Sequence, residues 1–387
     1  MYFTDEPQHI TMLRDTLRRF VAAELPPAKA RQCDRERTFD RESFRRLAGL
    51  GVCGLTIEPE YGGQGRDIVA AIAVIEELAR HGPSLAAPYI HSAFYGGVNI
   101  GESGSEEQKR ELLPKLARGE LLFAYGLSEP DVGGDLASVT TRAHIRGDRV
   151  ILSGTKRWMT GARFADYFYC LVRSDADAPR YRNLSLLLVP SSARGITIRD
   201  IEHTGLRYAE TCDVIFDDVE VPIDNVVGGP AGWNEGWQKL AGPSLDVEKL
   251  EITACALGLA SGAVELAWRY AQERTQFGKP ICAHQSVRHV LVDARTKLQA
   301  CRHMLYHAAW LANERRPCSV ETSMAKLFVG DTAVQIVLAC QQVMGAYGCA
   351  QDYDMERFVR DVLVMPIVGG SSKMQKNNIA ARLRLPQ

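Results

Sequence analysis

Residues Tyr125 to Asp135 read YGLSEPDVGGD, and residues Gly154 to Thr160 read GTKRWMT. The first stretch combines short hydroxyl, proline and glycine residues, and the second contains a tryptophan and ends on a threonine. A flat cofactor ring needs backbone that can approach closely, short hydrogen-bond donors at its rim and a large aromatic over one face. Each stretch alone has the composition of an ordinary turn. Together they predict a flavin site.

The remainder of the chain divides into three regions by its hydrophobic pattern. Up to about residue 120, apolar residues recur three and four positions apart, which predicts packed helices. From 121 to about 225, alternation and short apolar runs such as Leu184 to Val189 predict a β-domain of short strands. Beyond Gly228-Gly-Pro230 the helical spacing returns in four stretches, which predicts an antiparallel bundle. We expect an α+β protein with domains at 1–120, 121–227 and 228–387.

Composition and charge exclude several classes of partner. The chain has 387 residues and a formal charge of −1, which gives no electrostatic reason to bind nucleic acid or an anionic membrane. Its ten cysteines form no CxxC pair, and no basic-then-apolar leader precedes them. No apolar run approaches the roughly 20 residues of a membrane span. We therefore expect a cytoplasmic protein with reduced thiols, without nucleic-acid or membrane partners.

Two motifs resemble other binding sites, but their context argues against them. Gly49, Gly51 and Gly54 form a GxGxxG pattern, yet it follows the end of a predicted helix and precedes the extended run Leu55 to Ile57. A dinucleotide-binding turn needs the reverse order. His303 and His307 lie four apart on a predicted helix, without a third ligand. We expect neither a Rossmann site nor a metal site.

Further motifs lie before and after the two opening stretches in a fixed order. They are YGGQG from Tyr61, ERTQFGKP from Glu273, His284-Gln285, QVMG from Gln342, Arg360-Asp361 and GGSS from Gly369. In order and spacing, the chain resembles the acyl-CoA dehydrogenase family over essentially its whole length. The resemblance implies FAD as cofactor, a helical, β and helical-bundle architecture, and α,β-dehydrogenation of an acyl thioester. It also implies an electron-transfer flavoprotein as electron acceptor.

The reaction needs one carboxylate base. In most of the family a glutamate occupies the position of Gly369, where this chain has no carboxylate. In the branch with isovaleryl- and long-chain-type enzymes, the base comes from a helix, in a run like LDLER. Leu245 to Lys249 read LDVEK, so the resemblance implies Glu248 as base. The alternatives are Glu251, one turn on, and a chain without a working base that serves as a subunit of a heteromeric enzyme.

The resemblance also assigns binding residues. The flavin contacts within one chain are Tyr125, Leu127, Ser128, Gly133, Trp158 and Thr160. The contacts offered to the FAD of a neighbouring subunit are Arg274, Gln276, Phe277, Gln285, Gln342, Gly345 and Ala346. The substrate contacts are Gly134, Asp246, Lys249 and Gly369. Sharing of FAD between subunits implies a homodimer or homotetramer, with a heteromeric pair as the alternative.

The sequence departs from the family at several of these positions. Gly134 replaces a serine, Gly161 an asparagine, Lys249 an arginine and Lys373 a glutamine. The lysine keeps a positive charge but loses the bidentate fork of arginine. Val368-Gly369 replaces a bulky Tyr-Glu pair, which removes volume from the roof of the acyl pocket. We expect a bulky, branched or cyclic acyl group, carried by CoA or by an acyl carrier protein.

Overall fold

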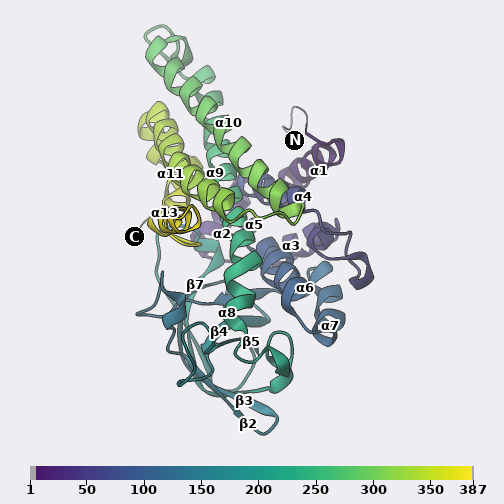
Figure 1. The fold of residues 1–387 in the computed structure, drawn as a ribbon. Helices are drawn as coiled ribbons and strands as arrows, with labels where there is room; N and C mark the ends of the chain where they lie inside the picture. Colours follow the sequence, from purple (N-terminus) through teal and green to yellow (C-terminus); the bar gives the residue numbers. More distant parts are fainter. Residues whose placement is uncertain (1–5, 386–387) are drawn as a thin grey trace.

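The computed structural model describes residues 6–385, and helices form its N-terminal third (Figure 1). Most of these helices bury one apolar core, which continues into the C-terminal helices, while the last two pack into a core shared with the β-domain. The helices are α1 (Gln8–Glu24), α2 (Pro27–Glu36), α3 (Arg41–Ala48), α4 (Ile68–Ala79), α5 (Ala86–Ile90), α6 (Asn99–Ser103) and α7 (Glu106–Ala117). A π-helix, His91–Val98, joins α5 to α6. The predicted helical unit is confirmed.

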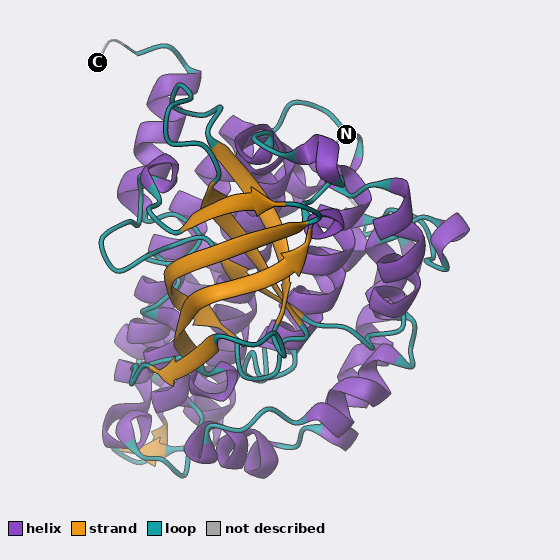
Figure 2. Ribbon diagram, turned by 90° about the horizontal axis from the view of Figure 1, so that it is seen from below, coloured by secondary structure: helices purple, strands orange, loops and turns teal. Residues whose placement is uncertain are grey.

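The middle of the chain forms a curled seven-stranded sheet, seen from below in Figure 2. The strands are β1 (Phe123–Gly126), β2 (Arg142–Arg146), β3 (Arg149–Thr160), β4 (Tyr167–Arg173), β5 (Leu184–Pro190), β6 (Ile196–Asp200) and β7 (Thr211–Pro222). Their order is β1-β4-β2-β3-β7-β6, with β5 also paired to β4. Most pairs are antiparallel, while β1 runs parallel to β4. The predicted β-domain is confirmed.

Long helices return after the sheet and extend away from it (Figure 1). The long ones are α9 (Leu245–Glu273), α10 (Gln285–Asn313) and α11 (Ser319–Met344), and shorter ones are α8 (Gly236–Lys239), α12 (Met355–Val362) and α13 (Ser372–Arg382). A short hairpin, β8 (Thr275–Gln276) and β9 (Lys279–Pro280), links α9 to α10. The helical C-terminal domain agrees with the expected α+β architecture.

Two glycines let α9 approach α4 closely. A Cβ at Gly258 would lie 2.5 Å from the Glu76 carbonyl oxygen, and one at Gly262 would lie 2.1 Å from that of Arg80. Real Cβ contacts of this length would force the helices apart. The two glycines therefore fix the position of α9, the helix that carries Glu248, against the N-terminal helices.

Two local expectations were wrong. The run Leu55 to Ile57 is not a strand, because residues Val52–Thr56 form a 3₁₀ helix after a left-handed turn at Gly51 (φ 81°). The second expectation was that no apolar run approaches the length of a membrane span. Two bundle helices, within Gly236–Glu273 and Ser319–Cys349, are long and apolar enough to span a membrane by length and composition alone. Most of the first apolar stretch is buried inside the protein, as in the core helix of a folded domain.

Candidate active site

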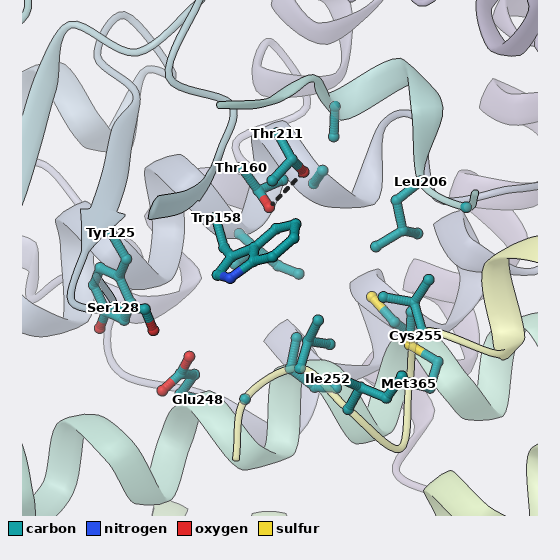
Figure 3. A pocket seen from close by; sticks show the side chains of 18 of the residues that line it. Tyr125, Ser128, Trp158, Thr160, Leu206, Thr211, Glu248, Ile252, Cys255 and Met365 are labelled. Carbon is teal, nitrogen blue, oxygen red and sulfur yellow. Dashed lines mark hydrogen bonds between the residues drawn. The ribbon is translucent and has the colours of Figure 1, made fainter. Parts of the chain in front are cut away.

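A cavity of about 540 Å³ lies where the β-domain meets α9 (Figure 3). Its walls come from the loop after β1, the end of β3, residues 203–211 and the first turns of α9. Residues 364–371, which we call the roof segment, close another side. Segments far apart in the sequence therefore meet around one space.

Trp158 lies in a β-bulge of β3. Pairing with β7 breaks between Lys156 and Met159, and the backbone of Trp158 has φ 64°, which is rare outside glycine. The bulge turns the indole out of the sheet, leaving it 54% exposed and directed into the middle of the cavity (Figure 3). An aromatic held this way offers a flat face to a ring bound beside it.

The two stretches that predicted the flavin site are joined by buried contacts. The backbone N–H of Arg157 donates to the carbonyl of Ser128 at 2.9 Å. Lys156 Nζ donates to Glu129 Oε1 at 2.9 Å, and both side chains are buried. Glu129 also accepts from the backbone of Thr140. These contacts fix the loop after β1 relative to the bulge.

The cavity wall fits the ring system of FAD. A Cβ at Gly133 would meet open space, so backbone at this point is free for close approach. Within residues 6–385, Nδ1 of the cavity-lining His91 is a buried polar atom without a hydrogen-bond partner. Thr160 Oγ1 lies 3.2 Å from Thr211 Oγ1 at the rim. Leu127 and Ser128 complete this wall.

Glu248 projects into the cavity from the first turn of α9 (Figure 3). Burial raises the pKa of Glu248 to about 7, against the ammonium groups of Lys249 and Lys326, which lower it. A carboxylate with a pKa near neutrality is well matched to accept a proton at neutral pH.

Glu251 is a different kind of carboxyl group. It is 2% exposed, it does not line the cavity, and its Oε2 has no hydrogen-bond partner within residues 6–385. Burial, and then the charge of Glu248, raise the pKa of Glu251 well above its usual range. Glu251 is therefore a neutral acid behind the wall. Of the two candidate bases, only Glu248 faces the cavity.

The predicted substrate residues separate into two groups. Gly134 and Gly369 line the cavity, and a Cβ at Gly134 would lie 3.0 Å from Sδ of Met374. Asp246 and Lys249 do not line it. Lys249 Nζ donates to Asp246 Oδ1 at 2.8 Å, and Asp246 also accepts from Ser319 of α11. Asp246 lies about 160° around α9 from Glu248, at about 100° per residue. Its side chain therefore points away from the cavity and links α9 to α11.

The predicted contacts to a neighbouring FAD gather at the far end of the bundle. Arg274, Gln276 and Phe277 lie at the β8–β9 hairpin, Gln285 begins α10, and Gln342, Gly345 and Ala346 lie at the end of α11. The Arg274 guanidinium stands 5.7 Å from the ring centre of Tyr347, which connects the two ends. Arg274 lies about 39 Å along α9 from Glu248, at about 1.5 Å per residue. One chain does not bring this cluster to its own cavity.

Sequence reasoning missed several residues that shape the site. Tyr95, from the π-helix, stacks on Tyr125 with ring centres 3.8 Å apart, and Asn99 donates to the Tyr125 hydroxyl. Leu206 lines the cavity, and its backbone N–H donates to Asp361 Oδ1 at 2.6 Å. Asp361 belongs to the Arg360-Asp361 motif, but the loop around Leu206 has no sequence pattern that predicts a contact with it.

Family models match nearly the whole chain. They are the "Acyl-CoA dehydrogenase, N-terminal domain" over residues 7–120, the "middle domain" over 124–219 and the "C-terminal domain" over 234–384.

Curated proteins and solved structures agree with these matches. An "Acyl-CoA dehydrogenase" of Bacillus subtilis (strain 168) is 34% identical over 95% of this chain and 96% of its own length. A "Cyclohexane-1-carbonyl-CoA dehydrogenase" of Geobacter metallireducens is 34% identical over 99% of both chains. The solved structure of a glutaryl-coenzyme A dehydrogenase in complex with glutaryl-CoA is similar to this chain with a TM-score of 0.93 at 30% identity. The match covers 99% of this chain and 97% of that one.

Proposed function

Because this chain belongs to the acyl-CoA dehydrogenase family, an FAD-dependent group that oxidises acyl thioesters at a CH–CH bond, we propose that Glu248 is its catalytic base. One observation carries the proposal. Glu248 is the glutamate that projects into the cavity, and it faces the wall formed by Ser128 and Trp158 (Figure 3). A base on one side and a flavin-binding wall on the other suit removal of two hydrogens from one C–C bond.

The residues of the chain divide the work. Glu248 accepts the proton from the α-carbon of the acyl group and becomes a neutral acid. Glu248 is desolvated by burial, so its carboxylate is a stronger base than one in solution. Tyr125, Leu127, Ser128, Gly133, Trp158 and Thr160 would hold the flavin. Bound FAD supplies the acceptor for the hydride that leaves the β-carbon.

We propose a bulky or cyclic acyl group as substrate. The wall around Glu248 is apolar, with Ile252, Cys255 and Val368. The relative named for cyclohexane-1-carbonyl-CoA supports this proposal. We expect cyclohexanecarbonyl-CoA to reduce the enzyme's flavin faster than butyryl- or octanoyl-CoA. Best activity on an unbranched chain would contradict it.

The central experiment compares the wild type with Glu248→Gln. Each FAD-loaded protein is mixed anaerobically with the same panel of acyl-CoA thioesters while the flavin absorbance is followed. We expect bleaching with the wild type and a loss of at least about 10³-fold in its rate with the variant, because the amide cannot accept the proton. Equal bleaching by both proteins would exclude Glu248 as base.

We propose that the active assembly contains at least two copies of this chain. The far-end cluster includes Phe277, which is 93% exposed, a costly position for a large aromatic in a lone chain. Supplying this cluster to a neighbour's FAD would cover it. Phe277→Asp should lower both the mass measured by light scattering and the FAD content. A monomeric wild type with full FAD content would contradict the proposal.

The electron acceptor that we propose is an electron-transfer flavoprotein. A reduced enzyme must pass on two electrons before the next turnover, and a thioester oxidation without such an acceptor stops after one. Turnover that continues only when this acceptor is added, and not with oxygen alone, is the expected result.

A heteromeric enzyme in which this chain is the weaker subunit is the alternative. The loss of the family serine at Gly134 is the observation in its favour, because Gly134 lines the cavity without a hydroxyl. The purified chain alone would then fail to hold FAD or to bleach with any thioester, and a related chain would restore both properties.

A further inference from the structure

Lys326 is a buried ammonium group on α11 that the proposed mechanism does not use. It is 1% exposed, and its Nζ donates to the carbonyl oxygen of Met365 at 2.9 Å. A buried cation is costly unless hydrogen bonds and opposite charges offset its desolvation. Met365 belongs to the roof segment and lines the cavity. Lys326 therefore connects α11 to one wall of the active site.

The same helix holds the roof segment at its other end. Ser372 Oγ donates to Asp331 Oδ1 of α11 at 2.6 Å. From α13, Gln375 Nε2 donates to the carbonyls of Gly369 and Gly370 at 3.3 and 2.8 Å. The segment between Met365 and Ser372 is thus held at both ends and in the middle, and Lys326 is the charged member of this set.

The positive charge of Lys326 also acts on Glu248, the proposed base. Burial lowers the pKa of Lys326 to about 8, while the carboxylates of Glu248 and then Asp331 oppose that effect. Within residues 6–385, Lys326 forms no ion pair closer than 4 Å, whereas Lys249, the other cation near Glu248, donates to Asp246. Lys326 is therefore the nearby cation whose charge is not already compensated at short range.

The remaining groups around Glu248 contribute no competing charge at neutral pH. Glu251, on the same helix, is held neutral by burial. Tyr95 and Tyr125, from the opposite elements, have pKa values raised well above the usual range, chiefly by burial. The carboxylate of Glu248, on α9, and the ammonium of Lys326, on α11, thus influence each other's pKa between two packed helices.

We propose that Lys326 is a positioning residue for the dehydrogenation: it holds the roof segment through the Met365 carbonyl and, together with Lys249, supplies positive charge that favours the ionised form of Glu248. The proposal rests on Glu248 being the base. Glu248 touches the substrate, and Lys326 acts through it and through Met365.

The test separates proton removal from flavin chemistry. Phenylacetyl-CoA deuterated at its α-carbon has no β-hydrogen to lose, so exchange of the label with water reports the base alone. The FAD-loaded wild type, Glu248→Gln, Lys326→Met, Lys326→Arg and Gln375→Met are compared from pH 5 to 9, with exchange followed by NMR.

We expect the wild type to exchange with a midpoint near the pKa of Glu248 and Glu248→Gln not to exchange. In Lys326→Met the midpoint should move up by about one pH unit, because the ionised base loses a stabilising charge. Lys326→Arg should restore it. Gln375→Met removes hydrogen bonds to the roof segment but no charge, so it should slow exchange at every pH without moving the midpoint.

The outcomes distinguish the two proposals. Exchange that is equal in wild type and Glu248→Gln would overturn the assignment of the base. Exchange that depends on Glu248 but keeps its midpoint in Lys326→Met would overturn the role of Lys326 alone. If Lys326→Met does not fold, Lys326→Gln replaces it in the comparison with Lys326→Arg. An unchanged exchange midpoint in Lys326→Gln would equally overturn the role of Lys326.

Discussion

The side chain of Ile252 occupies the space that a side chain at Gly369 would need. A Cβ built at Gly369 would lie 2.9 Å from Cγ1 of Ile252, closer than real Cβ atoms approach. Gly369 also has φ 61°, which favours glycine. Ile252 lies one turn after Glu248 on α9. The helix that brings Glu248 to the cavity therefore also blocks a glutamate side chain at position 369 of the roof segment.

The first prediction is that the base cannot simply be moved to the roof. Glu248→Gln/Gly369→Glu should remain as inactive as Glu248→Gln, because the new side chain meets Ile252 and a strained backbone. Adding Ile252→Ala should recover measurable flavin reduction, which stopped-flow absorbance would detect. Glu248→Gln/Ile252→Ala is the control and should stay inactive. Full activity in the double variant would show that Ile252 does not block the site.

The second prediction concerns the pH dependence of flavin reduction. Glu248 acts as a base only when ionised, and burial raises its pKa to about 7. The rate at saturating thioester should fall about tenfold per pH unit below that value and level off above it. Glu251→Gln should keep the same midpoint, because Glu251 is already neutral. A midpoint near 4.5 in the wild type would contradict the assignment.

The third prediction is that Glu248→Gln stabilises the protein at high pH. A carboxyl with a folded pKa above its unfolded value contributes stability below the unfolded pKa and loses it as pH rises through the folded pKa. At pH 8 the variant should unfold with a free energy higher by about 1 to 3 kcal/mol, after allowing for partial exposure. At pH 4 the two proteins should be equal, as urea titrations at both pH values would test.

The fourth prediction concerns the buried pair that joins the flavin stretches. Burial tends to raise the pKa of Glu129, but Lys156 and the hydrogen bonds from Thr141 and Thr140 lower it to about 2. Lys156→Met leaves that charge buried and unpaired, which should cost about 3 to 5 kcal/mol of stability and weaken FAD binding.

Lys156→Met/Glu129→Gln is the matched control for that variant. It removes the unpaired charge while an amide oxygen can still accept from Thr140 and Thr141, so part of the stability should return. Denaturant titrations of the two variants, with FAD titrations beside them, would measure both effects. Equal stability in the single and double variants would mean that the unpaired charge of Glu129 is not the cause of the lost stability.

The sequence predicted the elements where the physical signal is local. Gly133 and Ser128 lie in a turn whose residues themselves favour that backbone, and the apolar spacing of α9 follows from the helical repeat. The left-handed turn at Gly51 is also local, but the prediction of extended backbone for Leu55 to Ile57 did not take it into account. The stacking of Tyr95 on Tyr125 joins a π-helix to a strand and leaves no pattern in either segment.

The sequence alone determined that a carboxylate at 248 or 251 was available and that position 369 had none. Which of the two glutamates faces the cavity depended on the rotation of α9, because residues three apart point about 60° from each other around a helix. Gly258 and Gly262 set that rotation by letting α4 pack against α9. The contact of Lys326 with Met365 depends likewise on how α11 meets the roof segment. Composition supplies the groups, but only packing between distant segments decides which of them share one desolvated space.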